Sequence, residues 1–211
     1  METLYIILGW LLGILSPSIM SRISDKYKKK NFQKIITNEL KDLKKRFALI
    51  PIMIYPRYGK LNEEILNWVM IQTNNFKELD VNEDRKKEIE KYVNSKENLK
   101  KLIDVYNLAE QKDKPAFNFK KMITSAIDSN LANFGLLEDK FSEKLLEVKF
   151  QINVFNEEVQ CVNDYLKMTF DSNISDTNHK IISKEIENKN IVIAEKAMLT
   201  VEKINDTINL K

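Results

Sequence analysis

The first twenty-one residues restrict the fold of this chain more than any other stretch. No side chain from Thr3 to Ser21 carries a charge, and Leu, Ile, Trp and Met dominate the part from Leu4 to Met20. A helix that crosses ~30 Å of hydrocarbon needs about 17 to 25 residues, because it rises ~1.5 Å per residue. Segment 1–21 is therefore predicted to be a short transmembrane anchor.

A cluster of basic residues directly follows the apolar segment. Its members are Arg22, Lys26, Lys28, Lys29 and Lys30. Under the positive-inside rule this flank stays in the cytoplasm and the N-terminus lies outside. We therefore expect a single-pass protein of the inner (cytoplasmic) membrane, with its body in the cytoplasm and its basic cluster facing membrane lipid.

The charge of the chain is unevenly distributed. Residues 22–46 hold ten basic and three acidic side chains, a net charge of +7. The whole chain has a net charge of +3 and Glu2 contributes −1, which leaves −3 for residues 47–211. Anionic lipid explains positive charge beside an anchor more simply than nucleic acid does.

Two other interpretations of the first segment remain open. A cleaved signal peptide has positive charges before its apolar stretch and a small-residue cleavage site after it, whereas here Glu2 precedes and Pro17 and lysines follow. A buried helix of a soluble domain has a polar face, and this segment offers only Ser16 and Ser18 near its end. Neither fits the segment as well as a membrane anchor.

Small residues follow one another at helical spacing within the anchor. Gly9 and Gly13 form a G-x-x-x-G pair, and Ser16 continues the stripe. Such residues let helix backbones approach closely in lipid, so we expect self-association into a homo-oligomer. Glycine is also common in membrane helices without that role. Pro17 removes a backbone donor and predicts a kink or break, either as a gate or as the place where the helix leaves the bilayer.

The composition favours an all-α protein. Charged residues make up 31% of the chain, with only four glycines and four prolines, which disfavours a sheet built on tight turns. The single cysteine, Cys161, excludes an intramolecular disulfide and suits a reducing compartment. The expected architecture is an N-terminal transmembrane helix, a cytosolic helical bundle and a long antiparallel C-terminal helical hairpin.

Residues 22–50 are expected to form a basic amphipathic stalk helix. Apolar residues recur in it at intervals of three and four: Phe32, Ile36, Leu40, Leu43, Phe47 and Ile50. Pro51, Pro56 and Gly59 are expected to end this helix. The apolar segment 51–59 must then be buried against the domain core, a neighbouring subunit or the membrane surface.

Residues 51–135 are expected to form a region of shorter helices. Apolar spacing predicts helices over 62–76, over 83–111 and from a cap at Asn118 to Phe134.

Residues 136–211 hold the most regular cytosolic pattern. A seam with alternating steps of four and three, typical of a coiled coil, runs through Phe141, Leu145, Val148, Ile152, Phe155, Val159, Val162 and Leu166. A polar break at 171–178 separates it from a second, looser pattern through Ile182 to Ile208, with Asn190 at an inward position. Two antiparallel arms of about 45 Å follow from ~30 residues each. They must dock on the shorter helices or pair between subunits.

Enzymatic chemistry finds little support in the sequence. The only histidine, His179, falls at the polar break, and Cys161 falls within the first long arm, where a buried apolar role is typical. Metal-binding and phosphate-binding motifs are absent, and the neighbouring carboxylates point to different helix faces. We therefore expect no enzyme, no catalytic residue, no metal and no cofactor.

The start of the chain, with LGWLLGILSPSI between a short external end and a basic helix, resembles small single-pass proteins of bacterial anti-phage defence loci. Among these it is similar to the Hailong-type channel effectors. The resemblance covers residues 1 to 50 and the overall layout. It implies an oligomeric membrane channel that responds to a nucleotide or oligonucleotide signal.

An anionic oligonucleotide needs cations for its phosphates and aromatic faces for its bases. Arg57 and Tyr58, together with Tyr55, form one candidate site, and Lys120 and Lys121 beside Phe117 and Phe119 form another. The competing interpretation is that these aromatic residues belong to the core and the lysines to the solvated surface.

Two functions of different class follow. The first is an oligomeric ion-channel or membrane-permeabilising effector controlled by its cytosolic body. The second is a membrane-tethered helical scaffold or sensor that binds a partner protein and conducts nothing.

Overall fold

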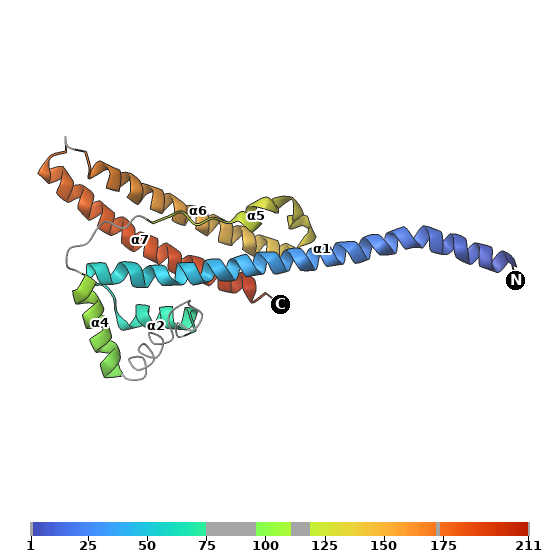
Figure 1. Ribbon diagram of the computed structural model, residues 1–211, viewed down its shortest axis with the longest axis horizontal. Helices are drawn as coiled ribbons and strands as arrows, with labels where there is room; N and C mark the ends of the chain where they lie inside the picture. Colours follow the sequence, from blue (N-terminus) through green and yellow to red (C-terminus); the bar gives the residue numbers. More distant parts are fainter. Residues whose placement is uncertain (1, 75–95, 111–118, 172–173, 211) are drawn as a thin grey trace.

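The fold is all-helical in the part of the chain that the structure describes. This computed structural model describes residues 2–74, 96–110, 119–171 and 174–210, without the side chains of 2–9, 11–19, 96, 109 and 110. No strand occurs in those ranges. Two long C-terminal helices pack beside one long N-terminal helix, and the shorter elements lie around them (Figure 1). The predicted all-α class and the C-terminal helical pair are confirmed.

Helix α1 (Glu2–Ile54) is a single helix of 53 residues. It projects far beyond the other helices, with the N-terminus at its free end (Figure 1). The six apolar residues from Phe32 to Ile50 that recur along the stalk are all buried. Before Phe32, every side chain that the structure describes is exposed except the half-buried Lys29. The helix therefore has a packed half and a free half.

The C-terminal hairpin consists of α6 (Asp139–Met168) and α7 (Asp176–Ile208). All eight residues of the predicted α6 seam are buried, from Phe141 to Leu166. Ser175 caps α7 by accepting a hydrogen bond from the Asn178 N–H. The α7 pattern is also confirmed in its C-terminal part, where Ile193, Ala197, Val201 and Ile204 are fully buried.

The hairpin docks on α1 rather than mainly on short helices. Helix α7 packs against both α6 and the packed half of α1. The rings of Phe47 on α1 and Phe155 on α6 meet edge to face, with 4.9 Å between their centres. The expectation that only short helices or a second subunit could cover the arms was therefore wrong, because α1 is long enough to supply the third face of the core.

The end of α1 lies beyond the expected boundary. The helix passes through Pro51 and ends at Ile54, where the 3₁₀ turn η1 (Tyr55–Tyr58) begins. Pro51 is tolerated because Phe47, Ile50 and Ile54 are buried and hold the surrounding turns in place. Gly59, at a φ of 64°, closes the turn. Of the three places considered for segment 51–59, the domain core is the one that buries Ile54 and Tyr55.

The short elements after η1 are α2 (Glu63–Gln72) and α4 (Lys96–Glu110). The Asn62 side chain caps α2 by accepting from the Ile65 N–H at 2.8 Å. Asn107 of α4 bonds both the N–H and the carbonyl oxygen of Leu61, at 3.2 and 3.0 Å. The helix predicted over 83–111 is confirmed from residue 96 to 110, and its first part lies outside the described residues.

The helix predicted from Asn118 to Phe134 is wrong. Residues 119–124 have no regular structure, and only α5 (Ser125–Ser129) and the 3₁₀ helix η2 (Leu131–Leu136) are helical. We call residues 119–129 the strap, because they lie along the groove between α1 and α6. The backbone of the strap bonds to side chains of these two helices, and these bonds replace the internal hydrogen bonds of a helix.

Candidate functional site

The basic cluster lies on the free half of α1. Arg22, Lys26, Lys28 and Lys30 are exposed. Lys29 is the exception: its ammonium is 3.1 Å from the Glu138 carboxylate at the beginning of α6. The helix thus presents cations on several sides, and apart from Lys29 these side chains are exposed. Such an arrangement suits a surface of anionic headgroups.

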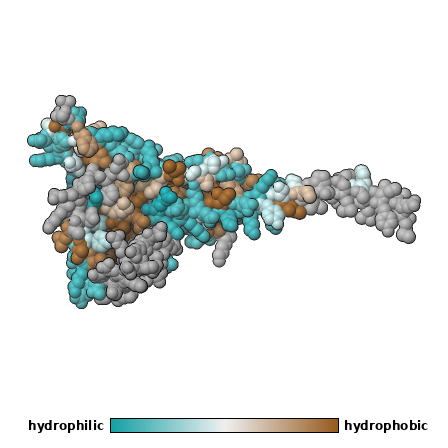
Figure 2. Space-filling view, in the orientation of Figure 1, coloured by the Kyte–Doolittle hydropathy of each residue, from teal (hydrophilic) through white to brown (hydrophobic). Residues whose placement is uncertain are grey.

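Large apolar side chains are exposed on the same free half. Met20 is 71% exposed, Ile23 52% and Tyr27 67%. Lys and Arg interspersed with Tyr and Ile are typical of the interfacial region of a membrane. In Figure 2, hydrophobic (brown) and hydrophilic (teal) surface alternate along the coloured part of the narrow projection.

The self-association residues Gly9, Gly13 and Ser16 and the kink residue Pro17 have side chains outside the described residues. The helical backbone of α1 passes through all four positions, so a break of the helix at Pro17 was a wrong expectation. The kink remains a prediction. Among the residues that the structure describes with their side chains, no helix has a stretch long and apolar enough to cross a bilayer.

Arg57 and Tyr58 lie in η1, at the end of α1. The Tyr58 hydroxyl accepts a hydrogen bond from Asn190 Nδ2 at 2.8 Å. Tyr55 is buried, and this burial, with a smaller contribution from Glu195, raises the pKa of its hydroxyl. Both tyrosines therefore contribute to the core, while Arg57 is half-buried beside them. These contacts favour the core interpretation of this candidate ligand site.

Lys120 and Lys121 are exposed on the strap, whereas Phe119 is buried. Lys121 lines an open groove of about 450 Å³ with Asn153, Glu157 and Gln160. Hydrogen bonds from Gln160 and Lys167, and in smaller part the charge of Lys121, hold the pKa of Asp164 below its usual value. The groove thus combines a cation with nearby carboxylates, which weakens its attraction for an anion. Phe117 lies outside the described residues.

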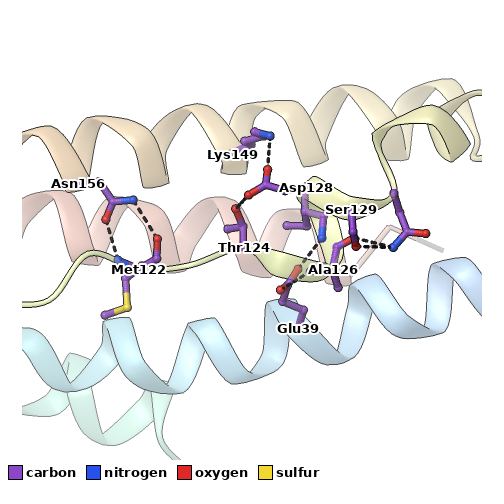
Figure 3. A network of polar contacts seen from close by, with 10 residues as sticks. Glu39, Met122, Thr124, Ala126, Asp128, Ser129, Lys149 and Asn156 are labelled. Carbon is purple, nitrogen blue, oxygen red and sulfur yellow. Dashed lines mark hydrogen bonds and ion pairs between the residues drawn. The ribbon is translucent and has the colours of Figure 1, made fainter.

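The strap is a polar junction that the sequence analysis did not identify. The Glu39 carboxylate of α1 accepts from the Ala126 and Ile127 N–H groups, each at 2.8 Å (Figure 3). On the other side, Asn156 of α6 bonds the N–H of Met122 at 2.7 Å and its carbonyl oxygen at 2.9 Å. A side chain from each long helix therefore holds the same short segment.

The strap contacts of α6 recur every seven residues. Lys149 pairs with Asp128, Asn156 bonds Met122, and Asn163 bonds the carbonyl oxygen of Phe119 at 3.3 Å. Residues seven apart lie on one face of a helix, so the strap runs antiparallel to α6 along a polar stripe. That spacing of polar residues is the sequence signal that could have revealed the strap.

The ion pair with Lys149 also affects the pKa of Asp128 in the strap. Its hydrogen bond to Asp128, assisted by one from Thr124, keeps the pKa of the Asp128 carboxyl below its ordinary value. The carboxylate is half exposed, so the pair belongs to the surface class of ion pairs.

The two residues considered for catalysis lie on different helices of the hairpin. Cys161 is half-buried on α6. His179 is half-buried in the first turn of α7, in an open depression with Lys180, Ser183 and Glu187. In the described residues, no group of three or more His, Cys, Asp or Glu side chains is placed to hold a metal ion.

Comparisons with known proteins identify no relative: no protein-family model, curated protein or solved structure matches this chain.

Proposed function

We propose that this protein is an oligomeric single-pass membrane protein that permeabilises the membrane or conducts ions, under the control of its cytosolic helical body. The observation that supports this proposal best is the continuity of α1 from Glu2 to Ile54. One half of this helix belongs to the core of the body, and the other half contains the uncharged segment and the basic cluster.

Continuity matters because a helix transmits motion. A scaffold on a tether needs only a flexible linker between its anchor and its body. Here the buried residues of the packed half and the uncharged segment share one hydrogen-bonded helix. A rotation or tilt of α1 within the body therefore moves the uncharged segment as well, which is the coupling that a controlled channel requires.

The membrane setting rests on the sequence and on the exposed free half of α1. The uncharged segment is placed in the inner membrane and the basic cluster at its cytoplasmic leaflet. The resemblance to effectors of anti-phage defence makes a nucleotide or oligonucleotide signal the expected regulator. Arg57 with Tyr58, and Lys120 with Lys121, remain its candidate contacts.

The alternative is a membrane-tethered scaffold or sensor that binds a partner protein and has no channel activity. Exposed aromatic side chains on the hairpin favour it, since Phe150 is 63% and Phe170 84% exposed. Such residues are typical anchors of protein interfaces.

Ion flux through liposomes that contain the full-length protein separates the two functions. We expect flux from the unaltered chain and its loss when Gly9 and Gly13 are replaced by leucine, because bulk at these positions keeps the helices apart. Leu11→Phe is the matched control, since it adds bulk on the opposite side of the same segment. Flux absent from all three proteins would eliminate the channel and leave the scaffold.

A further inference from the structure

The exposed apolar residues of the free half of α1 lie on one line. Met20, Ile23 and Tyr27 are separated by three and four residues. In the sequence, the same alternation continues backwards to Ser16, Gly13 and Gly9. Steps of four and three are the spacing of a coiled-coil seam. We call Met20, Ile23 and Tyr27 the stalk seam.

The stalk seam faces away from the body of its own chain. Each residue of a helix is turned by about 100° from the one before it. On this basis the stalk seam lies about 180° from the buried stripe formed by Phe32, Ile36 and Leu40. Lys29, whose ion pair ties α1 to Glu138, also lies on the side opposite the seam. No described part of the body is thus positioned to cover the seam.

We propose that the stalk seam is covered by the same seam of a second copy of this chain, in a parallel arrangement of stalks. This inference rests on the proposed membrane function, because anchors in one membrane share one orientation and one depth. Identical residues of neighbouring copies then lie at the same level, as a parallel heptad seam requires.

The charges beside the seam permit this pairing. Steps of four and three place Met20 and Tyr27 at the a positions of a heptad and Ile23 at a d position. In a parallel coil, the residue before an a position faces the residue five positions further along the partner. Lys26 then faces Asn31 of the other copy, so no lysine is opposed to a lysine there.

Of the remaining basic residues of the cluster, Arg22, Lys28 and Lys29 lie on the outer side of the pair, and Lys30 occupies the next seam position after Tyr27. The exposed Arg22 and Lys28 stay available to lipid headgroups.

The seam also has a defined end. By the same alternation of four and three, the positions after Tyr27 are Lys30 and Lys34, both of them exposed. A lysine at a seam position opposes the same lysine of its neighbour, so contact stops there. The stalks therefore meet close to the membrane and separate above it, with each body on the outside of the assembly.

Disulfide cross-linking of full-length protein in liposomes tests this arrangement. Cys161 is first replaced by alanine, and single cysteines are then introduced as Ile23→Cys, Tyr27→Cys and, as a matched control, Lys28→Cys. Under mild oxidation we expect the two seam variants to double in mass and the Lys28 variant to stay single. Equal cross-linking of all three would show random collision and overturn the proposal.

A second measurement addresses lipid as the occupant of the seam. A fluorescent label on the Ile23 or Tyr27 cysteine should be shielded from quenchers carried on lipid headgroups, whereas a label on the Lys28 cysteine should be quenched. Quenching at the seam without cross-linking would assign the seam to lipid and overturn the proposal.

Failure of this inference is distinguishable from failure of the proposed channel. Seam cross-links without ion flux would refute the channel and keep the parallel stalks. Ion flux without seam cross-links would refute the parallel stalks and keep the channel.

Discussion

The two halves of α1 have similar helical geometry and opposite surroundings. From Phe32 onwards one stripe of the helix is buried, chiefly by α7, α2 and the strap, while the described residues before it are almost all exposed. Tertiary packing of an apolar face normally supplies most of the stability of a helix in a protein. The free half thus depends on surroundings that the chain does not provide, such as lipid or other stalks.

The largest expected effect that separates the two halves comes from truncating one large apolar side chain in each. Phe47→Ala should lower the free energy of unfolding by about 3–5 kcal/mol, because it leaves a cavity against Phe155. Ile23→Ala should change it by less than about 0.5 kcal/mol. Urea unfolding in detergent, at concentrations where the protein is monomeric, measures both. Equal losses would mean that the free half is packed in solution.

Replacement of a glutamate by the neutral glutamine distinguishes the hydrogen bonds of the strap from a surface ion pair. Glu39→Gln removes one of two acceptors for the strap and turns a donor toward backbone N–H groups. We expect a loss of about 1–3 kcal/mol, with faster hydrogen exchange at Ala126 and Ile127. Glu138→Gln breaks only the exposed pair with Lys29 and should cost less than about 1 kcal/mol. Unchanged exchange in the Glu39 variant would contradict the role of the strap.

Asparagine-to-leucine substitutions at two sites of the packed body should change the free energy of unfolding in opposite directions. Asn190 is buried and its Oδ1 has no hydrogen-bond partner among the described residues, so leucine should raise the free energy of unfolding by about 1 kcal/mol despite the loss of the bond to Tyr58. Asn156 has both amide atoms bonded to Met122, so leucine there should lower it by about 1–3 kcal/mol. Thermal unfolding of both variants provides the test, and equal signs would contradict it.

The smallest expected effect is a dependence of strap stability on acid. The pKa of Asp128 is lower in the folded protein than in the unfolded chain, so its ion pair with Lys149 stabilises the strap above about pH 4. The stabilisation is lost as the pH falls through the depressed pKa. Hydrogen exchange of the strap should differ between the unaltered chain and Asp128→Asn at neutral pH, and the difference should vanish in acid. A difference that persists in acid would rule out the ion pair as its source.

The sequence predicted the elements whose pattern is local. Every seam position of α6 is buried, because a helix that turns by about 100° per residue places such positions on one face whatever lies elsewhere in the chain. The stalk residues of α1 followed from the same rule. The position of Asn190 inside the core was also foreseen, although its partner Tyr58 was not.

The strap could not be predicted by that rule. Its apolar spacing is helical, but the hydrogen bonds that decide its backbone come from Glu39, 87 residues away, and from Asn156, 34 residues away. The end of α1 was predicted too early, at Pro51, for a similar reason. A proline is tolerated within a helix where residues distant in the sequence hold the surrounding turns in place. The spacing of apolar residues gives no information on such distant contacts.

Because α1 is one continuous helix, the number of residues between its packed half and its free half determines the direction in which the free half faces. One residue inserted between Asn31 and Phe32 would lengthen the rod by ~1.5 Å and swing its outer end through about 100° relative to the hairpin. An insertion of about seven residues, close to two full turns, is the shortest that nearly restores the original direction. The direction in which the outer end of α1 faces relative to the hairpin, more than its distance from the hairpin, therefore depends on the exact number of residues in this helix.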